Sequence, residues 1–181
     1  MSNIGFFGLT GNPPHFSHCY AIREALKQSD SVYISLVYKH PFNKSFIDYE
    51  HRKNMLDLIL KEYFSQEELL KIKCTEIDKE YLETTQQVPY SYNLLKLLKG
   101  KEPHNNFKLI IGEDNYKPDV WHRFFSYKEI EDKFGLIVIP DRNVHSTQVR
   151  EFMKNIEENK SFIVQACGES VFHYMKNNNL Y

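Results

Sequence analysis

The chain has 181 residues and a formal net charge of −1, with 41% hydrophobic and 14% aromatic residues. This length and apolar content predict one packed domain and exclude a disordered chain. The near-neutral charge gives no electrostatic reason to expect nucleic acid or an anionic membrane as a partner. Three scattered cysteines without a CxxC pair favour reduced thiols over a disulfide framework or a zinc site. Because no leader pattern and no apolar window of transmembrane length is found, we expect a cytoplasmic protein.

The first predicted element is a strand over residues 4–7 that runs into a glycine-containing loop. Gly8 and Gly11 let the backbone bend sharply and approach a ligand with no Cβ in the way. His15 and His18 follow at i and i+3, so both imidazoles share one face if a helix has begun. A strand, a glycine loop and a helix start together make an anion site, because free N–H groups and the helix dipole point at it. The segment therefore predicts a phosphate site that contains two histidines.

The rest of the chain alternates helices with strands. Helices are predicted over residues 19–27, 49–64 with Asp48 as N-cap, 91–99 with Ser91 as cap and Gly100 as its end, 127–133, 146–159 and 169–178. Strands are predicted over residues 32–38, 70–77, 107–111 and 136–139. Residues 39–44 and 80–89 are predicted to be loops because of their proline, asparagine and charged residues.

This alternation predicts right-handed βαβ units and a parallel sheet. We therefore expect an α/β fold with a Rossmann-like, doubly wound five-stranded sheet in the order 3-2-1-4-5. It would form a single domain over residues 1–181, with a C-terminal helical part from about residue 146. Ligands bind where the winding reverses, outside the carboxyl ends of strands one and four. The segments that meet there are residues 8–18 and 112–115, so topology alone predicts a site at the two histidines.

Residues 8–18, Gly-Leu-Thr-Gly-Asn-Pro-Pro-His-Phe-Ser-His, resemble the first signature of the HxGH nucleotidylyltransferases. More closely, the chain resembles the bacterial nicotinate or nicotinamide mononucleotide adenylyltransferases. The resemblance extends in order over nearly the whole chain, through an Arg-bearing helix at 50–56, a Pro-Tyr-Ser-Tyr stretch at 89–92, an Ile-Gly-x-Asp turn at 111–114, a Trp-His pair at 121–122, His-Ser-Thr-x-x-Arg at 145–150 and a Leu-Tyr ending. Residues 140–145 stand where the family usually carries a longer insertion, so any contact of that insertion is missing or supplied otherwise.

Three residues depart from the family pattern: Gly11 replaces an aromatic residue, Asn12 an aspartate and Ser17 a glycine. The loss of the aspartate removes a charge that could orient a loop amide or a histidine. Ser17 adds a Cβ where the family leaves room for the nucleotide. Together they could mark a different substrate or slow turnover, whereas the retained histidines argue against a loss of catalysis.

The resemblance implies adenylyl transfer from ATP to nicotinate or nicotinamide mononucleotide in NAD biosynthesis, with release of pyrophosphate. Such a reaction needs no protein nucleophile, so positioning and charge stabilisation carry it. We predict His15 and His18 as catalytic residues at the α-phosphate. The predicted ATP- and phosphate-binding residues are Gly8, Thr10, Lys44, Gly112, Asp114, Ser146, Thr147 and Arg150. The resemblance places Tyr90, Tyr92, Trp121 and His122 at the pyridine mononucleotide.

Mg²⁺ is expected to accompany ATP, coordinated mostly by phosphate and water and by no protein metal site. The two histidines could form a metal pair, but no third ligand has suitable spacing.

Several of these residues have simpler interpretations. The histidines could be surface or capping residues, Trp121 a core residue, and Arg150 and Lys44 solvent-facing cations. Arg52 could be a helix-face charge, and Asn12 a residue that hydrogen-bonds within its loop.

Two other functions stay open. One is adenylyl or cytidylyl transfer to another phosphate acceptor, such as phosphopantetheine; the other is a non-catalytic nucleotide-binding module. The sequence leaves the choice between the acid and the amide on the pyridine open, since His122, Arg123 or main-chain N–H groups could face a carboxylate. It also leaves open whether the chain forms a homo-oligomer.

Overall fold

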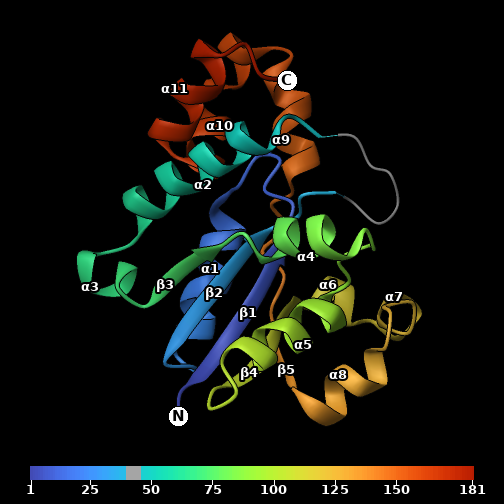
Figure 1. Ribbon diagram of the computed structural model, residues 1–181. Coiled ribbons are helices and arrows are strands. Elements are labelled where there is room, and N and C mark those ends of the chain that lie inside the picture. Colours follow the sequence, from blue (N-terminus) through green and yellow to red (C-terminus); the bar gives the residue numbers. More distant parts are fainter. Residues whose placement is uncertain (40–45) are drawn as a thin grey trace.

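Five parallel strands form one sheet in the order β3-β2-β1-β4-β5. The computed structural model describes residues 1–39 and 46–181. The strands are β1 (Asn3–Leu9), β2 (Ser31–Leu36), β3 (Ile72–Thr75), β4 (Asn106–Gly112) and β5 (Leu136–Ile139). β1 pairs with β2 on one side and with β4 on the other, so the winding reverses at β1. The predicted α/β fold and its strand order are confirmed (Figure 1).

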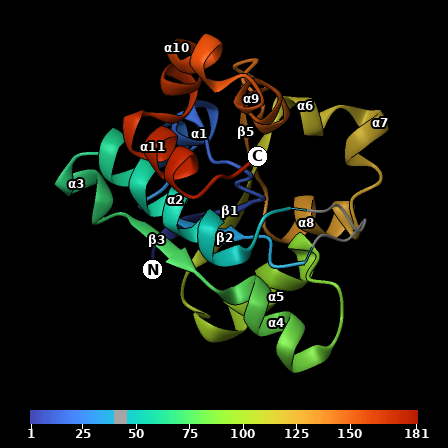
Figure 2. The ribbon, with the colours of Figure 1, turned by 90° about the horizontal axis from the view of Figure 1, so that it is seen from above.

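Helices cover both faces of this sheet, as Figures 1 and 2 show. One face carries α1 (Phe16–Leu26), α2 (Tyr49–Tyr63), α9 (Ser146–Met153), α10 (Ile156–Cys167) and α11 (Glu169–Asn177). The other carries α4 (Ile77–Thr85), α5 (Ser91–Lys101), α7 (Pro118–Trp121) and α8 (Tyr127–Lys133). Two short helices, α3 (Gln66–Leu69) and α6 (Glu113–Tyr116), follow α2 and β4. Each face buries its own apolar cluster, as expected for a parallel sheet. No helix in the described part of the chain is both long enough and apolar enough to cross a membrane.

The predictions for α8 and β5 are confirmed to the residue, whereas others are wrong. Residues 80–89 are not all loop, because α4 runs to Thr85 and ends at the left-handed Gln86. The third strand is shorter than the predicted 70–77, because Leu70 is the C-cap of α3, which begins behind a Ser65–Glu68 capping box, and Ile77 already begins α4. The predicted helix over residues 146–159 is two helices, since the backbone of Asn155 is not helical.

The predicted helix caps also need correction. Ser91 is the first helical residue of α5, with Tyr90 at the N-cap, and Gly100 lies inside the helix rather than at its end. Asp48 does occupy the N-cap position of α2, but its side chain makes no capping hydrogen bond.

Arg52 of α2 is buried, so its interpretation as a helix-face charge is wrong. Its Nη1 donates to the carbonyl oxygens of Thr10 and Val37, both at 2.8 Å, and its Nε donates to that of Ile47 at 3.1 Å. Thr10 and Val37 directly follow β1 and β2. A single guanidinium therefore bonds α2 to the carboxyl ends of two strands and holds the start of the glycine loop.

Candidate active site

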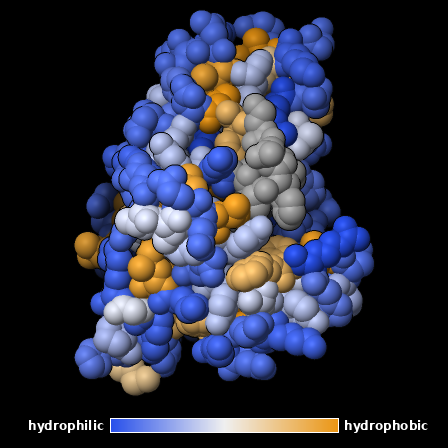
Figure 3. Space-filling view, turned by 45° about the vertical axis from the view of Figure 1, so that its right-hand side comes forward, coloured by the Kyte–Doolittle hydropathy of each residue, from blue (hydrophilic) through white to orange (hydrophobic). Residues whose placement is uncertain are grey.

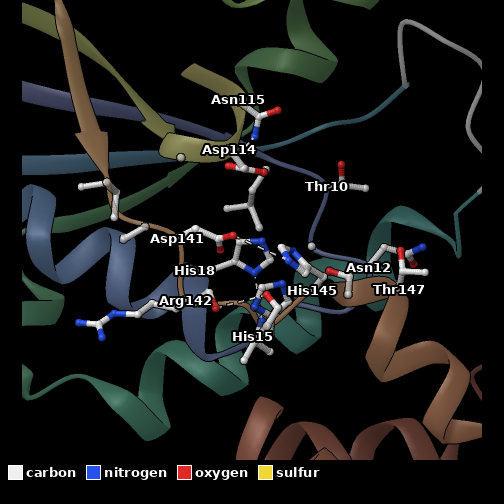
Figure 4. A pocket seen from close by; sticks show the side chains of 18 of the residues that line it. Thr10, Asn12, His15, His18, Asp114, Asn115, Asp141, Arg142, His145 and Thr147 are labelled. Carbon is white, nitrogen blue, oxygen red and sulfur yellow. Dashed lines mark hydrogen bonds and ion pairs between the residues drawn. The ribbon is translucent and has the colours of Figure 1, made fainter. Parts of the chain in front are cut away.

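A cavity of about 470 Å³ lies at the carboxyl ends of β1, β4 and β5 (Figure 4). Most of the predicted catalytic and phosphate-binding residues line it: Gly8, Thr10, His15, His18, Gly112, Asp114, Ser146, Thr147 and Arg150. The predicted Lys44 lies outside the described residues. Segments far apart in the sequence thus meet at the point where the winding of the sheet reverses. We call this space the phosphate cavity.

The two histidines of the first loop lie against each other at the start of α1. His15 is the N-cap residue, and its backbone N–H donates to Nδ1 of His18 at 3.1 Å. The centroids of the two rings are 3.8 Å apart. Because Nδ1 of His18 accepts this bond, the neutral ring carries its proton on Nε2. Nδ1 of His15 is buried and has no hydrogen-bond partner among the described residues.

Burial holds both imidazoles neutral in the ligand-free protein. It lowers the pKa of His15 well below its usual value, and the neighbouring His18 and His145 add to the effect. Burial and His145 lower the pKa of His18 to about 4. At neutral pH both rings therefore act as hydrogen-bond donors, and a bound phosphate would favour their protonation.

Helix α9 is bonded directly to the first loop. Ser146 Oγ donates to the carbonyl oxygen of Pro13 at 2.9 Å. Arg150 donates through Nη1 to the carbonyl oxygen of Asn12 at 2.6 Å and through Nη2 to Thr147 Oγ1 at 2.9 Å. The free N–H groups of the first turn of α9 consequently adjoin those at the start of α1, and two helix N-termini border one cavity.

The three departures in the first loop have local explanations. Asn12 is buried, and its Oδ1 accepts from Tyr181 Oη at 2.8 Å and from the backbone N–H of Ile47 at 3.4 Å. Asn12 is thus a hydrogen-bonding loop residue, as expected, but both partners of its side chain lie outside its own loop. Gly11 has φ +60, and a Cβ there would lie 2.8 Å from Leu36 Cδ2, so an aromatic residue does not fit. Ser17 Oγ donates to the carbonyl oxygen of Val144 at 3.3 Å.

Three titratable cavity residues were not predicted as site residues from the sequence: Asp141, Arg142 and His145. His145 is the N-cap residue of α9, and its Nε2 lies 4.0 Å from Asp141 Oδ2. The guanidinium of Arg142 lies 3.9 Å from the centre of the Tyr20 ring. All three lie within residues 140–145. His145 also opens the His-Ser-Thr-x-x-Arg stretch, whereas only their polarity could have indicated Asp141 and Arg142. Figure 4 shows His15, His18 and His145 gathered in the same space.

A second cavity, of about 600 Å³, adjoins the first through the shared residues Phe7, Gly8, Gly112 and Asn115. We call it the aromatic cavity. Of the four predicted pyridine-binding residues only Tyr90 lines it. Tyr92, Trp121 and His122 are absent from its wall, which instead contains Arg123, Phe124 and Phe125.

The structure places the other three predicted pyridine residues as follows. Trp121 is 2% exposed, and its Nε1 donates to Glu131 Oε1 at 2.8 Å. Tyr92 packs against Phe125 and Phe134, and the ring of His122 lies 4.8 Å from that of Tyr127. As arranged here, none of the three presents a free ring face to the aromatic cavity.

The described residues contain no group of three histidines, cysteines or acidic residues placed to hold a metal ion. The three neighbouring histidines of the phosphate cavity therefore do not form a metal centre. What the arrangement offers is a set of hydrogen-bond donors and a guanidinium around a space that fits phosphate groups.

Comparison with known proteins agrees with this geometry. A family model described as cytidylyltransferase-like matches residues 6–170. The chain is 27% identical over 202 residues to the nicotinate-nucleotide adenylyltransferase of Bacillus subtilis, covering 100% of this chain and 99% of that protein. It is 30% identical over 166 residues to a protein of Chlorobium phaeobacteroides named "Probable nicotinate-nucleotide adenylyltransferase", covering 85% of this chain and 77% of that one. A solved structure of Plasmodium falciparum nicotinic acid mononucleotide adenylyltransferase complexed with NaAD has a TM-score of 0.78 at 19% identity, covering 100% of this chain and 98% of that chain.

Proposed function

The chain belongs to the cytidylyltransferase-like family, and we propose that it transfers the adenylyl group of ATP to nicotinate mononucleotide in NAD biosynthesis. Pyrophosphate is the second product. The observation that carries the proposal is the phosphate cavity, in which His15 and His18 face the N-terminal turn of α9 across a space bordered by backbone N–H groups. The adjoining aromatic cavity supplies room for the other half of the dinucleotide.

In the proposed reaction a phosphate oxygen of the mononucleotide attacks the α-phosphorus of ATP. A new P–O bond forms on the α-phosphorus, and the bond to the bridging oxygen of the β-phosphate breaks. No protein atom is bonded covalently, so catalysis consists of positioning and charge stabilisation. His15 and His18 donate hydrogen bonds to the α-phosphate oxygens, where negative charge develops.

The remaining phosphate contacts are assigned by place in the cavity. Thr10 and the N–H groups of its loop lie on the side of the first strand, with Gly8 leaving the backbone open. Ser146, Thr147 and the first turn of α9 bind the β- and γ-phosphates. Arg150, whose guanidinium donates to the carbonyl oxygen of Asn12 in the structure, also donates to these phosphates. Gly112 and Asp114 border the adenosine. Lys44 remains a further candidate.

Mg²⁺ fits this cavity as a companion of ATP. The carboxylates of Asp114 and Asp141 line the cavity and are oxygen donors of the kind that Mg²⁺ prefers. Because the described residues form no three-ligand cluster, we propose that the ion is held by phosphate oxygens and water, with these carboxylates reached through water. When bound, it neutralises phosphate charge.

The acid is the preferred acceptor in this proposal. Arg123 lines the aromatic cavity, and its side chain makes no hydrogen bond or ion pair within the described residues. A guanidinium can hold a carboxylate through two parallel hydrogen bonds, which a neutral amide cannot accept in the same way. Reduced cysteines, all three free in the structure, agree with a reaction in the cytoplasm.

The test is steady-state turnover with ATP, Mg²⁺ and either nicotinate or nicotinamide mononucleotide, with chromatography of the dinucleotide. We expect a higher kcat/KM with the acid, and we expect Arg123→Ala to reduce this preference about tenfold. Lys128→Ala, which removes an exposed cation of the same segment outside the cavity, is the matched control. Absence of dinucleotide with both acceptors would contradict the proposed reaction, and turnover with phosphopantetheine instead would replace it.

A further inference from the structure

The turn after α11 brings Tyr181 against the first loop. Asn179 has φ 50, a left-handed conformation that asparagine adopts more readily than most residues. Its backbone N–H donates to the carbonyl oxygen of Lys176 at 3.3 Å. The backbone N–H of Leu180 donates to the carbonyl oxygen of Met175 at 3.0 Å. These are the two bonds of a Schellman motif, which ends a helix and fixes the direction of the chain after it. Tyr181 then packs against the apolar cluster on the α1 face of the sheet.

The hydroxyl of Tyr181 donates to the side chain of Asn12. Tyr181 Oη lies 2.8 Å from Asn12 Oδ1, and the same oxygen accepts from the backbone N–H of Ile47 at 3.4 Å. Because a backbone N–H can only donate, the atom that faces both partners is the amide oxygen, and the tyrosine hydroxyl supplies the hydrogen. Burial raises the pKa of Tyr181, so the hydroxyl stays protonated and able to donate at neutral pH.

The backbone of Asn12 is bonded to Arg150, which we propose as a phosphate ligand. The carbonyl oxygen of Asn12 accepts from Arg150 Nη1 at 2.6 Å. Arg52 donates to the carbonyl oxygen two residues earlier in the same loop, at 2.8 Å. Tyr181 is close enough to both guanidinium groups to interact with their charges. Asn12 therefore receives hydrogen bonds from α9, from the segment before α2 and from the segment after α11.

The direction of the Asn12 carbonyl depends on how its side chain is held. Gly11 stands directly before it with φ +60 and no side chain to restrict the backbone. The side chain of Asn12 is buried, and the Tyr181 hydroxyl is the closer of the two donors to its oxygen. Without that hydroxyl the buried oxygen keeps only the bond from Ile47, so the residue is held less firmly. The carbonyl, and with it the guanidinium bonded to it, would then shift.

We propose that Tyr181 is a positioning residue for ATP binding: its hydroxyl orients Asn12, and Asn12 in turn places the guanidinium of Arg150 at the β- and γ-phosphates. Tyr181 itself lines neither cavity. The proposal rests on the proposed function, because it requires Arg150 to bind the phosphates of ATP. It also gives a role to the position where this chain has asparagine in place of the family's aspartate, since either side chain offers an oxygen to the hydroxyl.

The kinetic test removes this one hydroxyl group. Tyr181→Phe is expected to raise the KM for ATP about threefold to fivefold, the effect of one lost hydrogen bond, while the KM for nicotinate mononucleotide stays within about twofold. Asn12→Asp keeps an acceptor for the hydroxyl and should leave the KM for ATP within about twofold of the wild type. An unchanged KM for ATP in Tyr181→Phe, or an equal rise in both KM values, would overturn the proposal.

Tyr174→Phe is the matched control. Tyr174 Oη lies 2.9 Å from His51 Nδ1 and accepts from Asn54 Nδ2 at 3.0 Å, so this hydroxyl also joins α11 to α2. Tyr174 lines neither cavity. The control should lower the melting temperature at least as much as Tyr181→Phe does, and it should leave the KM for ATP unchanged. The same rise in the KM for ATP in both variants would overturn the proposal, because any loosening of the C-terminal helices would then have this effect.

A double-mutant cycle tests whether the hydroxyl acts through Asn12. Asn12→Leu keeps a side chain of similar size and removes the acceptor, so adding Tyr181→Phe to it should not raise the KM for ATP further. Additive effects of the two substitutions would overturn the proposal, because the hydroxyl would then act independently of Asn12.

Calorimetric titration with ATP and Mg²⁺ separates the two possible failures. If the wild type binds ATP but forms no dinucleotide, the proposed function fails, and the role of Tyr181 is still tested, because ATP affinity should fall about threefold to fivefold in Tyr181→Phe. If the wild type forms the dinucleotide and Tyr181→Phe binds ATP equally well, only the role of Tyr181 fails. A wild type that does not bind ATP would overturn both.

Discussion

The bond between the backbone of His15 and Nδ1 of His18 determines what each imidazole can do. It places the His18 proton on Nε2, and it keeps the two rings 3.8 Å apart, where charging both would be unfavourable. The site is therefore built around neutral donors, and a bound phosphate is what would make a positive charge favourable.

The titration of His18 tests this description. The pKa of its imidazole is lowered to about 4, against 6.5 for a free histidine. Between these pH values the unfolded chain binds more protons than the folded one, so this group's contribution to stability is present above pH 6.5 and is lost as the pH falls toward 4. NMR of the imidazole should show a constant resonance from pH 8 to about pH 5.5 and a midpoint near pH 4. A midpoint near 6.5 would contradict the buried, neutral ring.

His145 adds a third imidazole to the phosphate cavity. It stands before the first turn of α9, with Asp141 and Arg142 beside it and His15 and His18 facing it. We expect His145→Ala to raise the KM for ATP about tenfold, because one charge-assisted hydrogen bond to the triphosphate is lost. His145→Lys should recover part of this loss.

His173 is the matched control for His145. It is 58% exposed on its side chain against 57% for His145, and it pairs with Glu169 at the same i,i+4 spacing, but it lies on α11 outside the cavity. His173→Ala should leave the kinetics with ATP unchanged. Equal effects of the two alanine variants would show that His145 makes no phosphate contact.

The sequence predicts the residues whose role depends on local spacing. His15, His18, Ser146 and Arg150 belong to short motifs at helix starts, and each lines the predicted cavity. Their roles at the phosphates are proposals. The neighbours of Trp121 are a harder problem, because residues 121–127 include two phenylalanines and a tyrosine besides the tryptophan. Which of these rings faces inward depends on α7, α8 and the turn between them, which spacing does not reveal.

At the scale of elements, α2 stabilises the first loop through Arg52, a role that the charge pattern of the helix does not indicate. Arg52 was one of several charges on a predicted amphipathic helix, yet it bonds to three carbonyl oxygens and lies 4.6 Å from the Phe46 ring. Loop carbonyls at strand ends have no ladder partner, so a buried guanidinium satisfies them. The helix thereby fixes the loop that carries the histidines.

Replacing Arg52 should affect both folding and catalysis. We expect Arg52→Ala to lower the free energy of unfolding by about 3 kcal/mol, because buried carbonyl oxygens lose a charged donor. It should also lower kcat, since Thr10 lies at the released end. Urea denaturation measures the first effect and steady-state kinetics the second.

Lys53→Ala serves as the comparison for Arg52→Ala. Lys53 is the next residue of α2, is about half exposed and pairs with Glu76. An exposed ion pair of this kind should contribute less than about 1 kcal/mol. A similar loss of stability in the two variants would mean that the carbonyl bonds of Arg52 contribute little.

The bounds of an element could be predicted where local sequence determines them, and could not be predicted where contacts distant in the sequence do. The predicted bounds of α8 and β5 are correct because the apolar pattern of the sequence indicates both elements, and Pro140 ends the strand. Helix α4 was missed because few of its residues are apolar; Ile77 and Asp78 are its buried residues, and Asp78 Oδ1 accepts from the backbone N–H of Tyr38. That bond to the end of β2 is tertiary, and so no local pattern indicates the helix.

At the scale of the whole molecule, the switch point between β1 and β4 explains why the site is where it is. The sheet order brings the glycine loop, the end of β4 and α9 to one edge, and the two cavities meet there. The surface shown in Figure 3 is mainly hydrophilic, with apolar residues in small separate patches. Topology could be predicted because alternating elements leave few possible arrangements, whereas the wall of the aromatic cavity depends on short helices that leave little trace in the sequence.

The most direct measurement is the fate of the two ends of ATP. ATP labelled at the α-phosphate should give label in the dinucleotide, and ATP labelled at the γ-phosphate should give label in pyrophosphate, in equal amounts with nicotinate mononucleotide. His18→Ala should abolish both signals together. Label from the α-phosphate in AMP or on the protein, or label from the γ-phosphate in orthophosphate without dinucleotide, would contradict adenylyl transfer in the phosphate cavity.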